Sequence, residues 1–290
     1  MTALPYKTVD LHCHSYYSDG TFSPEALVIE AKKRGLWALA LTDHDSIDGI
    51  SLFHQAGKKH GFETITGIEL AAEYTAFQKQ EIHIVGLGFS PFSQAIAEIL
   101  EKAALSRKKR NEEMVSALNQ IGFAISYEEI EQNAGGNVIT RAHFANVLIK
   151  KGIVKTKKEA FAKYLSKGRP AYVDRAFLSP ALCVEAIKKA NGAAVLAHPT
   201  LYAMDDTQIE HMAKELKAYG LDGIETDYST YCSAQRQKMT DMAKRLQLLP
   251  CGGSDFHGKN KPDIHLGVGR GNLHVPYCYW EELKKRCAMP

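Results

Sequence analysis

The sequence predicts an α/β fold in which helices wrap a parallel β-sheet and one helical insertion interrupts the pattern. Short apolar runs alternate with helical stretches over most of the 290 residues, as in parallel strands joined by helices. The alternation stops between residue 93 and about residue 175. Polar residues suited to chemistry stand at or just beyond the ends of the strand-like runs, where a (β/α) barrel builds its sites.

Seven segments have the composition of buried strands. The clearest is residues 36–42, because a near-continuous apolar run is typical of a strand covered on both faces. The seven candidates are residues 8–12, 36–42, 63–70, 82–89, 193–197, 222–226 and 248–251. Between the first two, Ser23 and Pro24 predict the start of a helix that runs to about Arg34, since serine caps a helix and proline fits its first turn.

Residues 93–175 are expected to form a helical insertion that caps the site, and residues 1–92 and 176–290 the barrel. Apolar residues at helical spacing predict helices over 94–121, 127–133, 140–150 and 156–166, with a break at 134–137. Residues 101–175 hold 15 Lys and Arg against 8 Asp and Glu, whereas the whole chain carries a formal net charge of only +3. A basic cap would draw in a phosphorylated substrate. Solvated helix faces explain its lysines better, but arginines grip phosphate bidentately.

The composition is that of a globular protein, with 45% hydrophobic residues. No stretch of about 18 apolar residues could span a membrane, and the N-terminus lacks the apolar core of a signal peptide. We therefore expect a cytoplasmic protein that does not associate with a membrane. The six cysteines form no C-x-x-C pair and are expected to be free thiols.

Three distant segments carry residues that bind hard divalent cations. They are His12-Cys13-His14 leading to Asp19, Thr42-Asp43-His44-Asp45, and Asp255-Phe256-His257. Histidine and carboxylate in pairs one residue apart suit Mn²⁺, Zn²⁺ or Fe²⁺ better than a thiolate site does, and alternate residues of a strand can grip one ion from one side. The chain has neither a G-x-S-x-G elbow nor a P-loop. The pattern predicts metal-assisted hydrolysis.

The order of these motifs resembles the PHP (polymerase and histidinol phosphatase) family of metal-dependent phosphoesterases. The matching positions are His12-x-His14-x4-Asp19-Gly20, Thr42-Asp43-His44-Asp45, Gly67-x-Glu69, His83, His198-Pro199 and Gly253-Ser254-Asp255-Phe256-His257. Within the family, Thr140-Arg141-Ala142-His143 and Gly168-Arg169-Pro170-Ala171-Tyr172-Val173 resemble a subgroup that includes the 3',5'-nucleotide bisphosphate phosphatase and a 5'-to-3' exoribonuclease.

The resemblance implies a distorted (β/α)7 barrel, in agreement with the seven strand candidates, and a site for three ions. It assigns His12, His14, Glu69 and Asp255 to one ion, Asp19, His44 and His257 to a second, and Glu69, His83 and His198 to a third, with Glu69 bridging. Mn²⁺ is the first expectation, and Zn²⁺ or Fe²⁺ also fit. Asp19, His44 and His257 are the expected catalytic residues, around a hydroxide that attacks phosphorus in line.

Two carboxylates and five basic residues complete the expected site. Asp43 and Asp45 are candidates to orient the imidazole ligands, although Asp45 could equally cap a helix. The expected substrate-binding residues are Arg107, Arg110, Arg141, His143 and Arg169. Arg107 and Arg110, three apart on a helix, could hold a second phosphate.

The expected reaction is hydrolysis of a terminal phosphate from a small nucleotide, with a 3',5'-nucleotide bisphosphate giving a nucleoside 5'-monophosphate and phosphate. The alternatives are a 5'-3' exoribonuclease acting on short 5'-phosphorylated RNA, a histidinol-phosphate phosphatase, and a non-catalytic metal-binding module. The insertion lacks a nucleic-acid motif with interleaved aromatic residues, so no long nucleic acid is expected as a partner.

Overall fold

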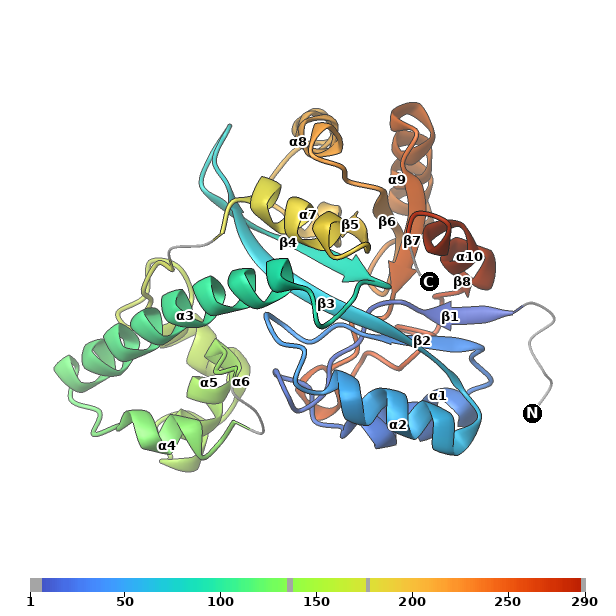
Figure 1. Cartoon of the computed structure of the whole chain (residues 1–290). Coiled ribbons are helices and arrows are strands. Elements are labelled where there is room, and N and C mark those ends of the chain that lie inside the picture. The colour runs from blue at the N-terminus through green and yellow to red at the C-terminus, as the bar shows by residue number, and fades with distance from the viewer. Residues whose placement is uncertain (1–6, 135–137, 176–177, 288–290) are drawn as a thin grey trace.

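The computed structural model describes residues 7–134, 138–175 and 178–287 as an eight-stranded sheet with helices around it (Figure 1). The strand order is β7-β6-β5-β4-β3-β2-β1-β8. The strands are β1 (Thr8–Asp10), β2 (Ala38–Leu41), β3 (Glu63–Tyr74), β4 (Gln80–Leu87), β5 (Ala193–Leu196), β6 (Gly223–Tyr228), β7 (Leu249–Gly253) and β8 (Val275–Pro276). All seven predicted strands are present, and β8 adds a two-residue strand antiparallel to β1.

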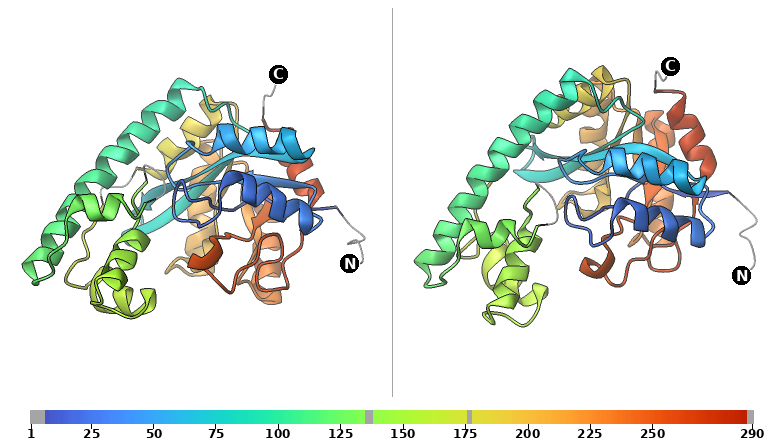
Figure 2. Two further views of the ribbon diagram at one scale, coloured as in Figure 1. Left: turned by 90° about the horizontal axis from the view of Figure 1, so that it is seen from below. Right: turned by 60° about the horizontal axis from the view of Figure 1, so that its bottom comes forward.

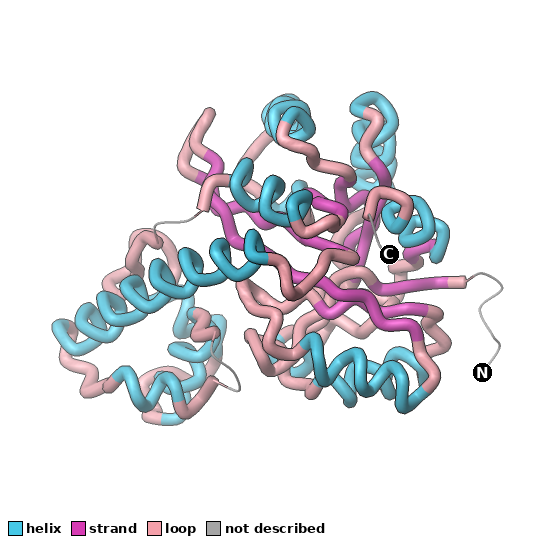
Figure 3. The backbone as a smooth tube through the Cα atoms, viewed as in Figure 1, coloured by secondary structure: helices cyan, strands magenta, loops and turns pink. Residues whose placement is uncertain are grey.

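The sheet curls into a nearly closed barrel, because the segments that follow β1 and β7 meet. The Leu11 amide donates to the Gly252 carbonyl over 3.2 Å, and the Asp255 amide donates to the His12 carbonyl over 2.8 Å. A parallel bridge between Cys13 and Phe256 continues the contact. Helices surround the strands (Figure 3), and the predicted α/β barrel with additional helices is confirmed.

The prediction of a wholly parallel sheet was wrong at β4, which runs antiparallel to both β3 and β5. Only residues 75–79 separate β3 from β4, and a parallel crossover needs a dozen residues or more. β3 also extends past its predicted end at Leu70 to Tyr74. Glu69 therefore lies within a strand rather than at its end, and so does His83.

Helices cover the outside of the barrel (Figures 1 and 2). α1 (Pro24–Lys33) and α2 (Ile50–His60) pack beside β2, around Leu39, Leu41 and Phe53. The start of α1 is as predicted, since the Ser23 hydroxyl accepts a hydrogen bond from the Ala26 amide over 3.0 Å. α7 (Pro180–Lys189), α8 (Asp206–Ala218) and α9 (Ser233–Leu246) bury the largest apolar cluster against β3 to β6. α10 (Tyr277–Lys284) packs Trp280 and Leu283 against β1, β4 and β5.

Between β4 and α7 the chain forms a helical segment beside the barrel, comprising α3 (Gln94–Gln120), α4 (Tyr127–Glu131), α5 (Arg141–Lys150), α6 (Lys157–Ala160) and a π-helical turn (Phe161–Leu165). These helices pack around a separate apolar core that includes Met114, Leu118, Phe144 and Leu148. The amino-terminal half of α3 joins the barrel core through Ile96, Ile99 and Ala103.

Some predicted features fall outside the described residues. The expected start of the barrel lies in residues 1–6, most of the predicted helix break in residues 135–137, and the return to the barrel at residues 176–177. The six cysteines are free thiols, as predicted. Across the described ranges, none of the helices has both the length and the apolar character needed to cross a bilayer.

We expect Gly253→Ala to destabilise the fold, because β7 approaches β1 too closely for a side chain. A Cβ atom on Gly253 would lie 2.4 Å from the His12 Cβ and 2.5 Å from the His12 nitrogen. Overpacking of this kind typically lowers the free energy of unfolding by about 1–3 kcal/mol. Urea denaturation would measure the change. Gly61→Ala is the control, since its Cβ would meet nothing within 4 Å and the cost there comes only from the left-handed backbone. A Gly253→Ala protein as stable as wild type would contradict the close approach.

Candidate metal centre

Nine side chains converge at the carboxyl end of the barrel, and they are the nine that the sequence analysis selected as metal ligands. His12, His14 and Asp19 follow β1, and His44 follows β2. Glu69 and His83 project from the neighbouring strands β3 and β4. The remaining three, His198, Asp255 and His257, follow β5 and β7.

Glu69 lies at the centre of this cluster and is 1% exposed. Its Oε2 atom lies within 3.3 Å of one nitrogen each of His12, His14 and His44. Its Oε1 atom lies 2.7 Å from His83 Nδ1 and 2.9 Å from His198 Nε2. Burial opposes ionisation of the carboxyl, but the imidazole charges of His83 and His44 outweigh it and hold the pKa of Glu69 well below its usual range.

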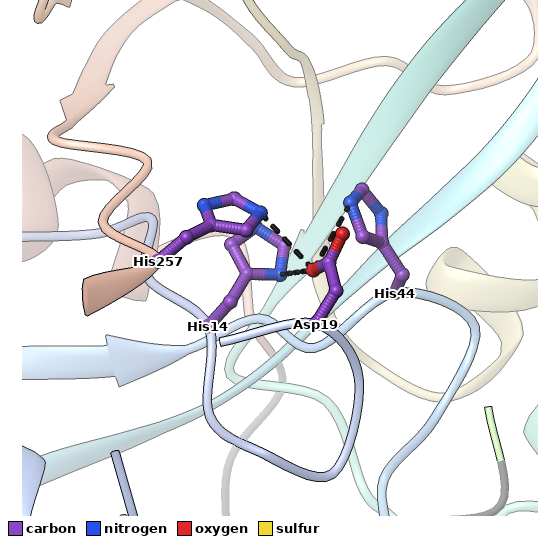
Figure 4. Close-up of side chains that lie close together, drawn as sticks. All are labelled: His14, Asp19, His44 and His257. Carbon is purple, nitrogen blue, oxygen red and sulfur yellow. Dashed lines mark ion pairs between the residues drawn. The ribbon is translucent and has the colours of Figure 1, made fainter. Parts of the chain in front are cut away.

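Two aspartates, Asp19 and Asp255, complete the cluster. Asp19 Oδ1 lies 3.1 Å from His257 Nε2 and 3.8 Å from His44 Nε2, with His14 next to them (Figure 4). Asp255 Oδ1 lies 3.3 Å from both His14 Nε2 and His257 Nδ1.

The donor atoms fall into four overlapping groups, each compact enough for one ion, with all atoms of a group within 4.8 Å of one another. The groups are His14, Asp19, His44 and His257; His12, Glu69 and His198; His12, His14 and Asp255; and His44, Glu69 and His83. The expected partition differs in detail. His14 also joins the group around Asp19, and His44 also joins Glu69 and His83.

Several of these atoms are buried without a hydrogen-bond partner in the described part of the chain, which fits a site built for cations. They include His12 Nε2, His14 Nε2, Asp19 Oδ1 and Glu69 Oε2, all of which face the cluster. Unpaired buried polar atoms are costly, and each needs a partner. Imidazole nitrogen and carboxylate oxygen are the donors that Mn²⁺, Zn²⁺ and Fe²⁺ accept.

The carboxylate that orients the His12 imidazole is Glu225, on β6. Its Oε1 lies 2.8 Å from His12 Nδ1, and its Oε2 accepts a hydrogen bond from the His198 amide over 2.6 Å. This contact leaves His12 Nε2 directed towards the cluster. This role of Glu225 was not predicted, although Glu225 stands at the end of a predicted strand, where the other site residues cluster.

The expectation that Asp43 or Asp45 would orient the imidazoles was wrong. Asp43 accepts hydrogen bonds from the hydroxyls of Ser15 and Ser18, each over 2.6 Å, and so shapes the loop that carries Asp19. Asp45 is neither a helix cap nor an imidazole partner, because its carboxylate faces two arginines.

A further buried carboxylate, Asp10, joins the ligand-bearing segments that follow β1 and β7. It accepts hydrogen bonds from the His12 amide over 3.2 Å, from the Ser254 amide over 2.8 Å and from the Gly267 amide over 2.7 Å. Asp255 is held in turn by the Lys261 ammonium and the Tyr228 hydroxyl, both 2.5 Å from its Oδ2. These contacts position the ligands that the barrel strands alone do not fix.

A pocket of about 180 Å³ lies between the ligand cluster and the helical segment. Asp19, His44 and His83 line one side of it, and arginines line the other. Three of the arginines, Arg107, Arg110 and Arg141, were predicted from the sequence, and Arg175 was not. No periodic pattern marks Arg175, since it follows the last helix of the segment.

Two predicted substrate residues do not line this pocket. The Nδ1 atom of His143 accepts a hydrogen bond from the Thr140 amide over 3.0 Å and so caps α5, and burial lowers the pKa of His143 to about 4. The Arg169 side chain is exposed to solvent.

The arginines of the pocket differ in their partners. Arg107 and Arg175 share the Asp45 carboxylate, and Arg141 lies 3.4 Å from Glu81. Arg110 donates its Nε proton to Asn111 over 2.8 Å, but its Nη2 is buried and without a partner among the described residues. Burial and the nearby guanidinium of Arg107 lower the pKa of Arg110 to about 9.

Comparison with known proteins gives consistent results. A 5'-3' exoribonuclease of Haemophilus influenzae is 38% identical over 87% of this chain and 90% of its own length. A 3',5'-nucleoside bisphosphate phosphatase of Chromobacterium violaceum is 33% identical over 97% of this chain and 98% of its own. A crystal structure from Bifidobacterium adolescentis, described as that of a metal-dependent phosphoesterase, superimposes with a TM-score of 0.86 at 29% identity and covers 98% of both chains.

The profile of the PHP domain family matches residues 10–168, which include the first six of the nine clustered side chains and the whole of α3 to α6. Together with relatives that share more than 30% identity over most of the length, this match extends the resemblance of individual motifs to the whole chain. The chain belongs to the PHP domain family.

Proposed function

We propose that the protein removes one phosphate from a 3',5'-nucleoside bisphosphate, leaving a nucleoside 5'-monophosphate. As a member of its family the chain is a metal-dependent hydrolase of phosphate esters. The choice of substrate is the proposal, and it draws support from the relative of that name in Chromobacterium violaceum.

The observation that carries this choice is the Nη2 atom of Arg110, which is the part of its guanidinium left without a partner among the described residues. Its Nη2 is buried without a partner among the described residues, in a pocket whose opposite side is formed by Asp19 and His44. A buried cation needs an anion or a hydrogen-bond acceptor. The pocket thus has two poles for phosphate, one at the proposed ions and one at Arg110, and a substrate with two phosphates would satisfy both.

The nucleoside would extend beyond this pocket, because about 180 Å³ falls short of the 300–1,000 Å³ typical of sites that enclose a whole small ligand. A second pocket of about 500 Å³ shares Arg107 with the first and is lined by Leu100, Tyr127 and Ile139, among others. Its aromatic and aliphatic walls suit a base and a sugar.

The residues of the chain have distinct tasks in this proposal. The nine clustered side chains would hold the ions, and Glu225 fixes the orientation of His12. Divalent ions bound there supply Lewis-acid stabilisation of the phosphoryl oxygens and activate water for attack. Arg110 and Arg141 would hold the distal phosphate, so that the scissile one lies in line for attack. Mn²⁺, a three-ion site and the catalytic assignment of Asp19, His44 and His257 remain part of the proposal.

A 5'-3' exoribonuclease acting on short RNA is the second candidate, favoured by the 38% identical relative of that name. In that reaction Arg110 would hold the 5'-phosphate, and the ions the scissile phosphodiester. A histidinol-phosphate phosphatase is less favoured, because a substrate with one phosphate leaves Arg110 unpaired. Assaying phosphate release from adenosine 3',5'-bisphosphate beside mononucleotide release from 5'-phosphorylated trinucleotides would separate the two leading candidates.

Purified protein with Mn²⁺ should release phosphate from adenosine 3',5'-bisphosphate, and dialysis against a chelator should abolish this activity until Mn²⁺ is restored. Asp19→Asn and His257→Ala should each lower kcat by about a hundredfold or more, as expected when an electrostatic group of a transition-state site is removed. His274→Ala is the control, since His274 is exposed and outside the cluster. Full activity in both site variants would refute the ligand assignment.

Arg110→Ala should raise KM for adenosine 3',5'-bisphosphate by about tenfold or more, since a charge-assisted phosphate contact contributes about 1.5–3 kcal/mol. The kinetics with adenosine 3'-monophosphate, which lacks the distal phosphate, should change much less. Lys109→Ala is a matched control, because Lys109 is an exposed cation on the same helix. An equal rise in KM for the two substrates, or no rise for either, would show that Arg110 does not bind the distal phosphate.

A further inference from the structure

Asp45 connects the proposed metal centre to the arginines of the helical segment. It directly follows His44, and its amide donates to the Glu69 carbonyl over 3.0 Å. Its Oδ1 accepts a hydrogen bond from the Ala71 amide over 3.0 Å. The peptide link to His44 and these two hydrogen bonds therefore fix Asp45 relative to two of the expected ligands, His44 and Glu69.

The other carboxylate oxygen, Oδ2, faces two parts of the helical segment that lie far apart in sequence, the middle of α3 and the residues after the last helical turn. It pairs with Arg107 on α3 and, over 2.9 Å, with Arg175 after the last helical turn. Arg175 also donates to the Ala103 carbonyl over 3.0 Å, and Arg107 lies 3.4 Å from the Ile139 carbonyl. One buried carboxylate thus holds both the middle of α3 and the end of the segment.

This arrangement also determines where Arg110 lies. Arg107 and Arg110 are three residues apart on α3, and both line the same small pocket. Because Arg107 is held by Asp45, α3 cannot slide or rotate relative to His44 without breaking a buried ion pair. Asp45 therefore limits the separation between Arg110 and the ligand cluster.

We infer that Asp45 is a positioning residue that sets the distance between the two phosphate-binding poles and thereby selects substrates with two suitably spaced phosphates. This inference rests on the proposed function. Asp45 borders the second pocket, but its carboxylate is occupied by Arg107, Arg175 and Ala71, so it acts on the distal phosphate through the arginines and not by binding it.

The backbone conformation of Asp45 allows a substitution that changes only the charge of the side chain. Its φ angle is 46°, in the left-handed region that asparagine and aspartate tolerate better than most residues. Asp45→Asn therefore removes the charge that holds both arginines while preserving the size and the backbone preference of the residue. Alanine would add backbone strain to the loss of charge.

Asp45→Asn should raise KM for adenosine 3',5'-bisphosphate by about tenfold, with a much smaller change in kcat, because the distal phosphate meets displaced arginines. The kinetics with adenosine 3'-monophosphate should change by less than about threefold. Arg110→Ala should raise KM by a smaller factor in the Asp45→Asn protein than in the wild-type protein, since both changes act on the binding of the same phosphate.

Asp222→Asn is the matched control. The Asp222 carboxylate likewise accepts from a cation, Lys188 over 2.7 Å, and from a backbone amide, Ala194 over 2.9 Å, but it does not line the pocket. The Asp222→Asn protein should have wild-type kinetics with both substrates. If Asp45→Asn impaired the kinetics with both substrates equally, Asp45 would have a merely structural role. Unchanged kinetics with both substrates would overturn the inference as well.

A measurement without substrate separates this inference from the proposed function. In Asp45→Asn, the amides of α3 around Arg107 should exchange hydrogen faster than in wild type, whereas those of α9 should not. Unchanged exchange in α3 would refute the positioning role whatever the substrate. If exchange in α3 is faster but the wild-type protein does not prefer the bisphosphate, Asp45 does position α3. The selection of substrates with two phosphates and the proposed function would then both be refuted.

Discussion

The structure depends on one buried carboxylate, Glu69, with five imidazoles around it. A charge this deeply buried is tolerated only when positive groups surround it, so segments from both halves of the barrel must meet there. The hairpin of β3 and β4 supplies one of these imidazoles. Glu69 pairs with Val85 across the β3–β4 ladder, and His83, two residues along, faces the same side of the sheet. A tight hairpin thus brings a carboxylate and an imidazole together without a crossover helix.

The sequence predicted the strands and helices that have a periodic apolar pattern, and the metal ligands that stand in motifs. All seven strands were found from their apolar runs, and α1 from Ser23 and Pro24. The direction of β4 was missed because the predicted strands 63–70 and 82–89 left eleven residues between them, whereas β3 extends to Tyr74 and only residues 75–79 connect it to β4. The roles of Glu225 and Asp45 could not be predicted, because their partners lie 213 and 130 residues away, at His12 and Arg175. Single contacts over such distances leave no periodicity in the sequence.

The electrostatics of the pocket divide it into two unlike halves. On one side, Asp19, Glu69 and Asp255 gather negative charge among imidazoles, a setting that attracts cations. On the other, four arginines face two carboxylates, Asp45 and Glu81, so positive charge is in excess. A phosphate ester contacts both halves at once, since its oxygens can bind ions and guanidinium groups together. The basic character of residues 101–175 is therefore concentrated by the fold at a few arginines, while most of its lysines remain on solvated faces.

The separate core of the helical segment allows this part of the chain to change in sequence independently of the barrel. Met114, Phe144 and Leu148 stabilise these helices largely independently of the barrel that assembles the nine ligands. Substitutions on the surface that faces the ligands can accumulate there without weakening the barrel, provided that the contact to Asp45 persists. Descendants of one ancestral barrel could in this way acquire new substrates while inheriting the same hydrolytic chemistry.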